Sequence, residues 1–195
     1  MGLDTVELVV AFEKHFQLEI PDPIAEQMGS VGDVAVWVGQ QLGTTEQRLS
    51  VIRINVAKAL KHLLFAEQAN EEGDKLLKDL LPDLHAYQEA ARRLQDEHGL
   101  LFLIPDSIPR NSGNGWLRKL FAGFGPEGET TASLYKLSQL VDWTVAYNYE
   151  KLLMLPLTSQ YEVEQAVIGI TANKSGVDIP NIKLSSRFAY ELGMD

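Results

Sequence analysis

Apolar residues recur at intervals of three and four along most of this chain, which is the spacing of amphipathic α-helices. The first such stretch is residues 4–16, where Asp4 with Glu7 three residues later fits an N-cap and its acidic partner. We expect its inward face to be formed by Val6, Val9, Val10, Ala11 and Phe16. The first element is therefore predicted to be an amphipathic helix.

The same periodicity predicts an all-α fold. In chain order it predicts a turn at 17–23, a helical turn at 24–28, a helix at 34–42, long helices at 46–69, 75–98 and 131–155, a helix at 163–170 and a loop over 177–195. Pro21 and Pro23 are expected to end helical structure, and Pro82 to kink the second long helix or start a new one. Leu49 is expected to begin the inward stripe of the first long helix.

Composition bounds the compartment and the chemistry. The chain has 195 residues, 45% of them apolar, which is enough to bury a core. It has no cysteine, so disulfides, thiolate metal sites and cysteine catalysis are excluded. The sequence has neither a signal-like segment nor an apolar run of the roughly 20 residues that span a bilayer. We expect a cytoplasmic protein with no membrane span.

Acidic charge is concentrated in the two terminal segments. The net charge is −10, and residues 1–42 hold seven acids against one lysine, while residues 158–195 hold five acids against three basic residues. Residues 43–157 are nearly balanced. An acidic surface repels phosphate backbones and favours partners with basic patches, so we expect no nucleic-acid binding. Solubility alone is a competing explanation for the acidity.

Two motifs stand in the N-terminal segment, Leu3-Asp4-Thr5-Val6-Glu7-Leu8-Val9 and Glu19-Ile20-Pro21-Asp22. They resemble the second helix of acyl carrier proteins and the turn after it. In that family the helix follows an Asp-Ser-Leu tripeptide whose serine carries 4'-phosphopantetheine. The C-terminal segment ends in Leu192-Gly193-Met194-Asp195, which resembles the loop that precedes this serine. The resemblance implies a circularly permuted carrier fold.

This resemblance implies two domains. Residues 1–42 with 158–195 would close into an acyl-carrier-like four-helix bundle, and residues 43–157 would form an appended helical hairpin or bundle. Within the appended part, residues 105–115 have the composition of a linker. The pattern equally allows a domain-swapped homodimer, in which the C-terminal helix of one chain completes the N-terminal half of another.

The resemblance places the attachment site at the junction of Asp195 with Gly2 and Leu3. Where the family has its cofactor-bearing serine, this chain has Met1-Gly2. Neither residue has a hydroxyl, so no phosphodiester can form at that position. We therefore expect no cofactor in this chain, and 4'-phosphopantetheine only in a serine-bearing parent.

Acidic residues on and after the first helix are the candidate docking surface. In carriers the acidic face of this helix docks onto basic grooves of synthases and transferases. The matching positions, with two that extend the face, are Asp4, Glu7, Glu13, Asp22 and Glu26. Lys14 and His15 stand where carriers usually have acids, which favours a dedicated partner. A solvated helix face is the competing explanation.

No residue set in the sequence supports catalysis or metal binding. The four histidines, which are expected at the surface and lack metal-ligand spacing, are His15, His62, His85 and His98. No Gly-x-Ser-x-Gly elbow or glycine-rich phosphate loop frames a serine or threonine. We expect neither an enzyme nor a metal site.

The predicted function is a carrier-like scaffold that is unmodifiable in this chain. Its expected partners are acyl-transfer or acyl-processing enzymes with basic docking surfaces. The alternative is a non-catalytic helical protein–protein interaction module that has lost carrier chemistry.

Overall fold

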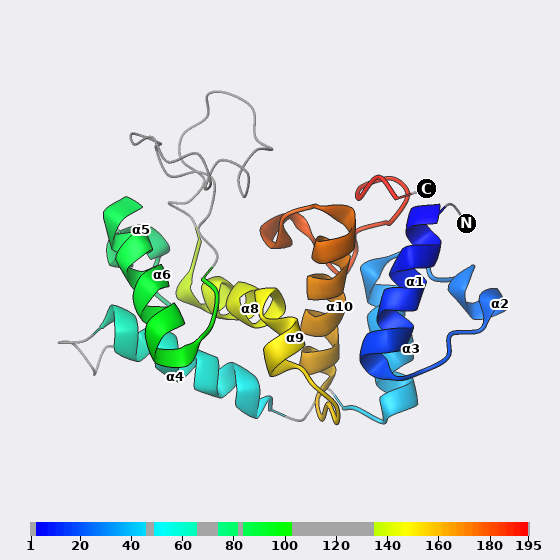
Figure 1. Cartoon of the computed structure of the whole chain (residues 1–195), viewed down its shortest axis with the longest axis horizontal. Coiled ribbons are helices and arrows are strands. Elements are labelled where there is room, and N and C mark those ends of the chain that lie inside the picture. Colours follow the sequence, from blue (N-terminus) through cyan, green and yellow to red (C-terminus); the bar gives the residue numbers. More distant parts are fainter. Residues whose placement is uncertain (1–2, 46–48, 66–73, 82–83, 103–134, 195) are drawn as a thin grey trace. The chain divides into compact units, whose positions relative to one another are not determined.

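The computed structural model describes residues 3–45, 49–65, 74–81, 84–102 and 135–194, and their regular structure is helical (Figure 1). Within these ranges, extended residues form only isolated bridges, so the predicted all-α fold is confirmed for them. The chain divides into two compact units. Unit 1 comprises residues 1–55 with 145–195, and unit 2 comprises residues 56–144.

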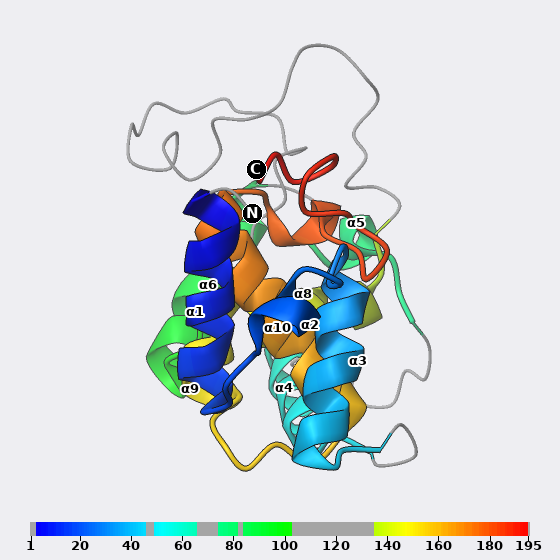
Figure 2. The same ribbon diagram turned by 90° about the vertical axis from the view of Figure 1, so that its right-hand side faces the viewer.

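Unit 1 is organised around one central helix. Its three long helices are α1 (Leu3–Phe16), α3 (Val31–Leu42) and α10 (Gln160–Ser175). Its short elements are α2 (Asp22–Ala25), α9 (Tyr149–Leu152) and the 3-10 turn η2 (Ile179–Asn181). Helix α10 contacts α1, α3, α9 and η2. It runs antiparallel to both α1 and α3 (Figures 1 and 2). The C-terminal segment therefore packs against the N-terminal segment within one chain.

The buried face of α1 differs from the predicted one. Leu8, Phe12 and Phe16, spaced by four residues, are each 1% exposed, whereas Val6 and Val10 are 44% and 54% exposed. The expectation that Val6 and Val10 face inward was wrong. Both sides of this helix carry apolar residues, and burying the two phenylalanine rings removes more apolar surface from water than burying two valines.

The rest of the unit 1 core comes from both terminal segments. Its buried apolar residues include Ile20, Val31, Val34, Val38, Val163, Ala166, Val167, Ile170, Phe188 and Leu192. The rings of Phe12 and Phe16 pack 6.5 Å apart beside them. Among the residues predicted for this core, Val9 is only half-buried and Val6 is exposed.

Capping residues fix the starts of the unit 1 helices. Helices α3 and α10 each begin with a capping box, Ser30 with Asp33 and Ser159 with Glu162. The prediction that the two prolines end helical structure was wrong, because Pro21 is the N-cap of α2 and Pro23 lies in its first turn. The first turn of a helix tolerates proline, since its N–H groups have no partner within the helix.

The C-terminal loop pairs with the start of α3. The Val31 N–H donates to the Ser186 carbonyl at 3.1 Å, and the Gly32 N–H donates to the Leu184 carbonyl at 2.7 Å. A Cβ at Gly32 would lie 2.9 Å from that same Leu184 oxygen, so the close approach requires glycine. The start of α1 and the end of this loop lie at the same end of unit 1 in both views (Figures 1 and 2).

The chain leaves the bundle of α1, α3 and α10 after α3 and returns to it before α10, at two neighbouring points. Thr45 and Ser159 form a parallel bridge, and the Gln160 N–H donates to the Thr45 carbonyl at 3.2 Å. The Gln160 side chain also donates from Nε2 to the Ala35 carbonyl and accepts from the Thr44 hydroxyl. Both crossing points are therefore held against α3.

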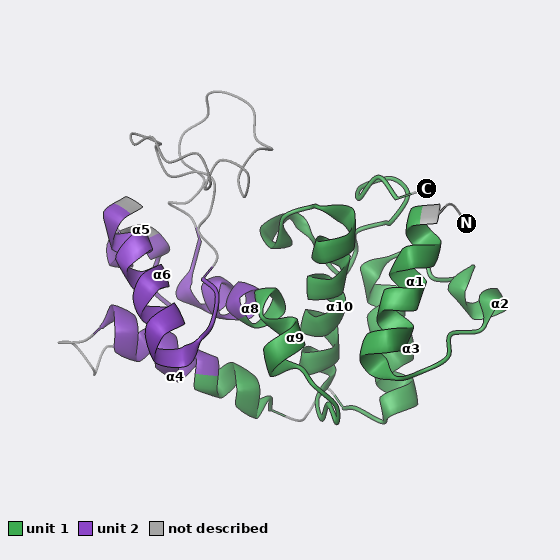
Figure 3. Ribbon diagram, viewed as in Figure 1, with its two compact units in different colours: residues 1–55, 145–195 green, residues 56–144 purple. Residues whose placement is uncertain are grey.

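Unit 2 contains α5 (Leu77–Leu80), α6 (Leu84–His98) and most of α4 (Val51–Leu64) and α8 (Leu137–Tyr147) (Figure 3). The Asp74 carboxylate accepts from the Ser138 N–H at 2.8 Å and from the Ser138 hydroxyl at 2.6 Å. Arg93 on α6 donates to the Leu63 carbonyl at the end of α4, at 3.4 Å. These bonds join residue 74 to the start of α8, and α6 to the end of α4.

The long helices predicted from periodicity are shorter in the structure. Helix α4 begins after Ser50, whose hydroxyl accepts from the Arg53 N–H, and Leu49 is 80% exposed instead of inward. The helix predicted over 131–155 is divided into α8 and α9 at Asn148, where ψ is +27°. The predicted linker at 105–115 lies outside the described residues. No helix in the described part of the chain is long and apolar enough to cross a membrane.

Candidate protein-docking surface on helix α1

The exposed side of α1 combines charged and apolar residues. Helical geometry places Glu7, Val10 and Lys14 opposite the buried Leu8, Phe12 and Phe16. We call the exposed group of Asp4, Val6, Glu7, Val10 and Lys14 the α1 face. It is acidic in its first turns and apolar in the middle, and it ends in a lysine. The apolar members were missed from the sequence because they were assigned to the core.

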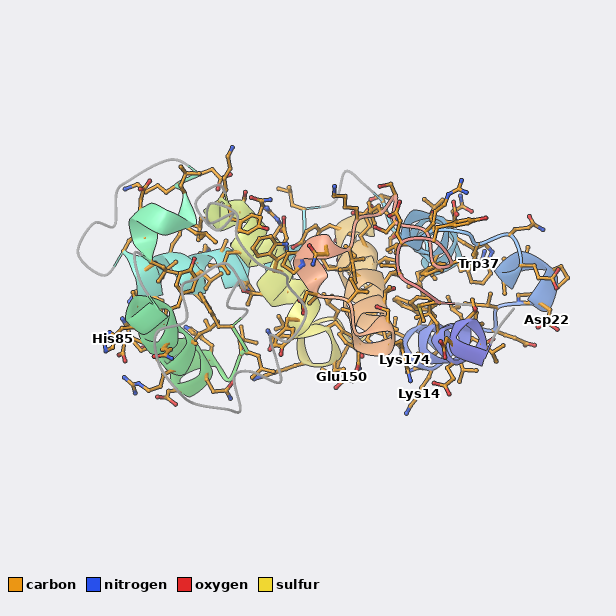
Figure 4. The ribbon with its side chains drawn as sticks, turned by 90° about the horizontal axis from the view of Figure 1, so that it is seen from above. Lys14, Asp22, Trp37, His85, Glu150 and Lys174 are labelled. Atoms are coloured by element: carbon orange, nitrogen blue, oxygen red, sulfur yellow. The ribbon has the colours of Figure 1, made fainter. Side chains whose placement is uncertain are left out.

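The predicted acids after α1 lie on a different element. Asp22 is the first residue of α2 and Glu26 is its C-cap, with both side chains exposed. In Figure 4 Asp22 lies at the outer end of α2, apart from Lys14 on α1. Asp4 and Glu7 thus share one helix face, and Asp22 and Glu26 occupy a separate short helix.

Glu13 has a structural partner. Its Oε1 accepts from the Ile20 N–H at 2.8 Å, and its backbone carbonyl accepts from the Leu18 N–H at 3.2 Å. Ile20 is buried and Glu13 itself is half-buried. The Glu13 carboxylate therefore fixes the turn that follows α1.

His15 is half-buried, so the prediction that it lies at the surface was wrong. Its ring packs edge-on against Phe16, with 5.0 Å between centroids, and against Tyr149 of α9, with 5.3 Å between centroids. Burial lowers the pKa of His15, and the Leu153 backbone and the Glu150 carboxylate partly oppose this shift. The sequence gives no signal that α9 covers this position.

Helix α9 packs closely on α10 through a glycine. A Cβ at Gly169 would collide with the Ala146 carbonyl and the Tyr149 ring. One turn further on, Asn173 Nδ2 donates to the Tyr149 hydroxyl at 3.1 Å. Burial is the main cause that raises the pKa of Tyr149. Gly169 therefore permits the contact by which α9 covers one side of α10.

A buried carboxylate joins α10 to the start of α4. Glu162 is 3% exposed, and its Oε1 accepts from the Ser50 hydroxyl at 2.7 Å. Its Oε2 accepts from the Thr158 N–H and hydroxyl, at 2.8 and 3.2 Å, and from the Ser159 N–H at 3.3 Å. These donors satisfy the carboxylate, which supports a structural role. The capping pattern Ser-x-x-Glu at 159–162 was the available signal for it.

Most of the predicted attachment junction lies outside the residues that the structure describes. Gly2 and Asp195 are not among the described residues, and Leu3 is the first residue of α1. The junction of Asp195 with Gly2 and Leu3 stays a prediction. In the ranges that are described, no group of three His, Asp or Glu side chains could hold a metal ion.

Comparison with curated proteins relates part of the chain to carriers. The acyl carrier protein of Phenylobacterium zucineum is 51% identical over 42 residues, which are 22% of this chain and 53% of that protein. That of Akkermansia muciniphila is 51% identical, and that of a Picosynechococcus species 46%, each over 42 residues, 22% of this chain and 52% of the relative. This chain contains an acyl-carrier-like region.

The similarity is partial. The chain spans about half the length of the curated relatives it matches. No family model matches the chain. No solved structure matches it significantly. A region of this chain is therefore similar to acyl carrier proteins, and the helical structure described for unit 1 is consistent with that similarity.

Proposed function

We propose that unit 1 is an acyl-carrier-like docking scaffold that presents the α1 face to acyl-processing enzymes and does not itself catalyse a reaction. The observation that carries this proposal is the packing of α10 and the C-terminal loop against α1 and α3. The segments that resemble the two halves of a carrier thus belong to one bundle. Their order in the chain supports a circularly permuted carrier, with residues 43–157 as an appended domain.

The α1 face suits recognition by a groove. An amphipathic helix binds in this way through anchors spaced by three and four residues. Val6 and Val10 lie one turn apart and would enter an apolar pocket. Glu7 lies one turn before Val10 and Asp4 one turn before Glu7, and both acids would pair with lysine or arginine on the partner, which speeds association and fixes orientation.

The proposed scaffold would carry no covalent cofactor at the matched position. Gly2 precedes Leu3 where a carrier has its serine, and it has no hydroxyl. A serine at this position would hold 4'-phosphopantetheine through a phosphodiester and carry an acyl group as a thioester. In this chain the Asp195, Gly2 and Leu3 junction would serve as scaffold alone, with closure inside one chain in preference to a swapped homodimer.

Mass spectrometry tests this proposal. Incubation with coenzyme A and a phosphopantetheinyl transferase should leave the intact mass unchanged. A variant that joins Asp195 to Leu3 through one serine, with new termini opened within 111–115, should gain one phosphopantetheine. Modification of the original chain would show that another hydroxyl is the true site.

The second candidate function is a non-catalytic helical protein–protein interaction module that has lost carrier chemistry. Gly2 is the observation that favours it, because a carrier without its serine has lost its cargo. A rejoined serine variant that keeps its helical circular dichroism signal and yet stays unmodified would support this module over the carrier-like scaffold.

A further inference from the structure

The α1 face is not uniformly acidic. Asp4 and Glu7 lie in the first two turns with Val6 between them, and Lys14 lies exposed in the last turn, with Val10 between Glu7 and Lys14. Glu13, the remaining acid of this helix, is bonded to the Ile20 N–H. Charge on the exposed side of α1 therefore changes sign along the helix axis.

Two accounts explain this division of charge. Acids at a helix start and cations at its end stabilise the helix through its dipole, which needs no partner. The dipole alone, however, gives no reason for Val10 to be exposed on the same side as Glu7 and Lys14, or for Val6 to be exposed one turn before Val10. Apolar anchors flanked by opposite charges are the pattern of a helix that binds in a groove with a fixed direction.

We infer that the α1 face docks onto a protein groove that is itself divided in charge, with lysine or arginine opposite Asp4 and Glu7, an apolar centre for Val6 and Val10, and a carboxylate opposite Lys14. This inference rests on the proposed function and specifies its partner. A groove that is basic throughout would place a cation opposite Lys14. Like charges in contact disfavour the wrong partner, so Lys14 selects against such grooves.

A binding experiment uses a phosphopantetheinyl transferase with a uniformly basic groove as the probe. Affinity for the full chain is measured by fluorescence anisotropy at low ionic strength without coenzyme A. Lys14→Glu should bind about five-fold more tightly than the wild type, and the gain should shrink at high salt because exposed charges are screened. The matched control is Lys174→Glu, also in a last helical turn of unit 1 but on α10, which runs antiparallel to α1. It should leave the affinity unchanged.

The second arm reverses the charge of the probe. The chain has no cysteine, so a single Lys14→Cys variant can be cross-linked to find the groove residue nearest position 14. When that basic groove residue is changed to glutamate, the wild-type chain should bind more tightly than Lys14→Glu. The same order of affinities for both probes would overturn the inference.

The outcomes separate the inference from the proposed function. If Glu7→Lys weakens binding while Lys14→Glu behaves like Lys174→Glu, then α1 docks but the partner groove is not divided, and the inference fails alone. If Glu7→Lys, Val10→Asp and Lys14→Glu all leave affinity unchanged, then α1 is not the docking surface and the proposed function fails as well.

Discussion

Helices α1 and α10 lie side by side in unit 1 and differ in how much of their surface is covered. Helix α1 buries one side and leaves Val6, Glu7 and Val10 exposed. Helix α10 is buried along most of its length, because α1 and α3 pack against it and α9 covers it as well. Helix α1 therefore leaves apolar and charged side chains accessible, and the covered helix α10 holds the bundle together.

One covered side of α10 is built from a glycine and polar residues, and polar residues are types usually found at the surface. Glu162, Gln165, Gly169 and Asn173 recur at intervals of three and four, and the first three are buried. Two of these positions contact α9, and Glu162 is bonded to Ser50. Small and polar residues thus form a contact surface here, since a glycine lets a neighbouring helix approach closely.

The largest expected effect breaks the buried side of α1. Phe12→Ala should lower the free energy of unfolding by about 3–5 kcal/mol, because it removes a buried ring and leaves a cavity. Val6→Ala on the exposed side should change it by less than about 0.5 kcal/mol. Urea denaturation of both variants measures the difference. Equal losses would mean that the two sides of α1 are not distinguished by burial.

A substitution at the seam of α9 and α10 tests why α10 is covered. Gly169→Ala should destabilise by about 1–3 kcal/mol through overpacking against the Ala146 carbonyl. On an exposed helix the same change would stabilise by up to about 1 kcal/mol. The exposed Lys174→Ala, near the same end of α10, is the control and should stay within about 0.5 kcal/mol. A stabilised Gly169→Ala variant would show that α9 does not pack there.

The buried carboxylate of α10 gives a third test. Ser50→Ala removes a donor to Glu162 and the hydroxyl that accepts from the Arg53 N–H, and it should cost about 1–2 kcal/mol. Ser50→Thr keeps a hydroxyl and should recover most of this loss. Thermal unfolding followed by circular dichroism compares the two variants with the wild type. Equal destabilisation by threonine and alanine would show that the Ser50 hydroxyl does not stabilise the fold through these bonds.

The smallest expected effect is a pH dependence at His15. Burial holds its pKa in the folded chain below the unfolded value of about 6.5, so the unfolded chain binds more protons. Stability should be unaffected by His15 above that pH and should fall as the pH drops from about 6.5 through the folded-state pKa. His15→Gln should flatten this slope, while the exposed His85→Gln should keep it. Denaturation midpoints between pH 7.5 and 5 provide the measurement.

Periodicity predicted the helices and could not choose their faces. In α1, Val6 and Val10 have the same four-residue spacing as Leu8 and Phe12, and only the neighbours in space decide which pair is buried. Of the acids that the sequence suggested for docking, Asp4 and Glu7 are exposed, whereas Glu13 bonds to Ile20 in a local turn that spacing does not encode. His15 was misplaced because α9, whose start is marked by neither proline nor glycine, covers it.

The bridge between Thr45 and Ser159 affects which insertions and deletions the chain can accept. The ends of the intervening segment are held at hydrogen-bonding distance by the bundle itself. Each doubling in length of a flexible loop closed in this way costs only about 0.6 kcal/mol. Exchanges of residues 56–144 for a segment of another size should therefore be tolerated, because Thr45, Ser50, α9 and Ser159 all lie outside that range. Unit 2 can therefore change in sequence and length while the bridge between Thr45 and Ser159 and the unit 1 bundle are kept.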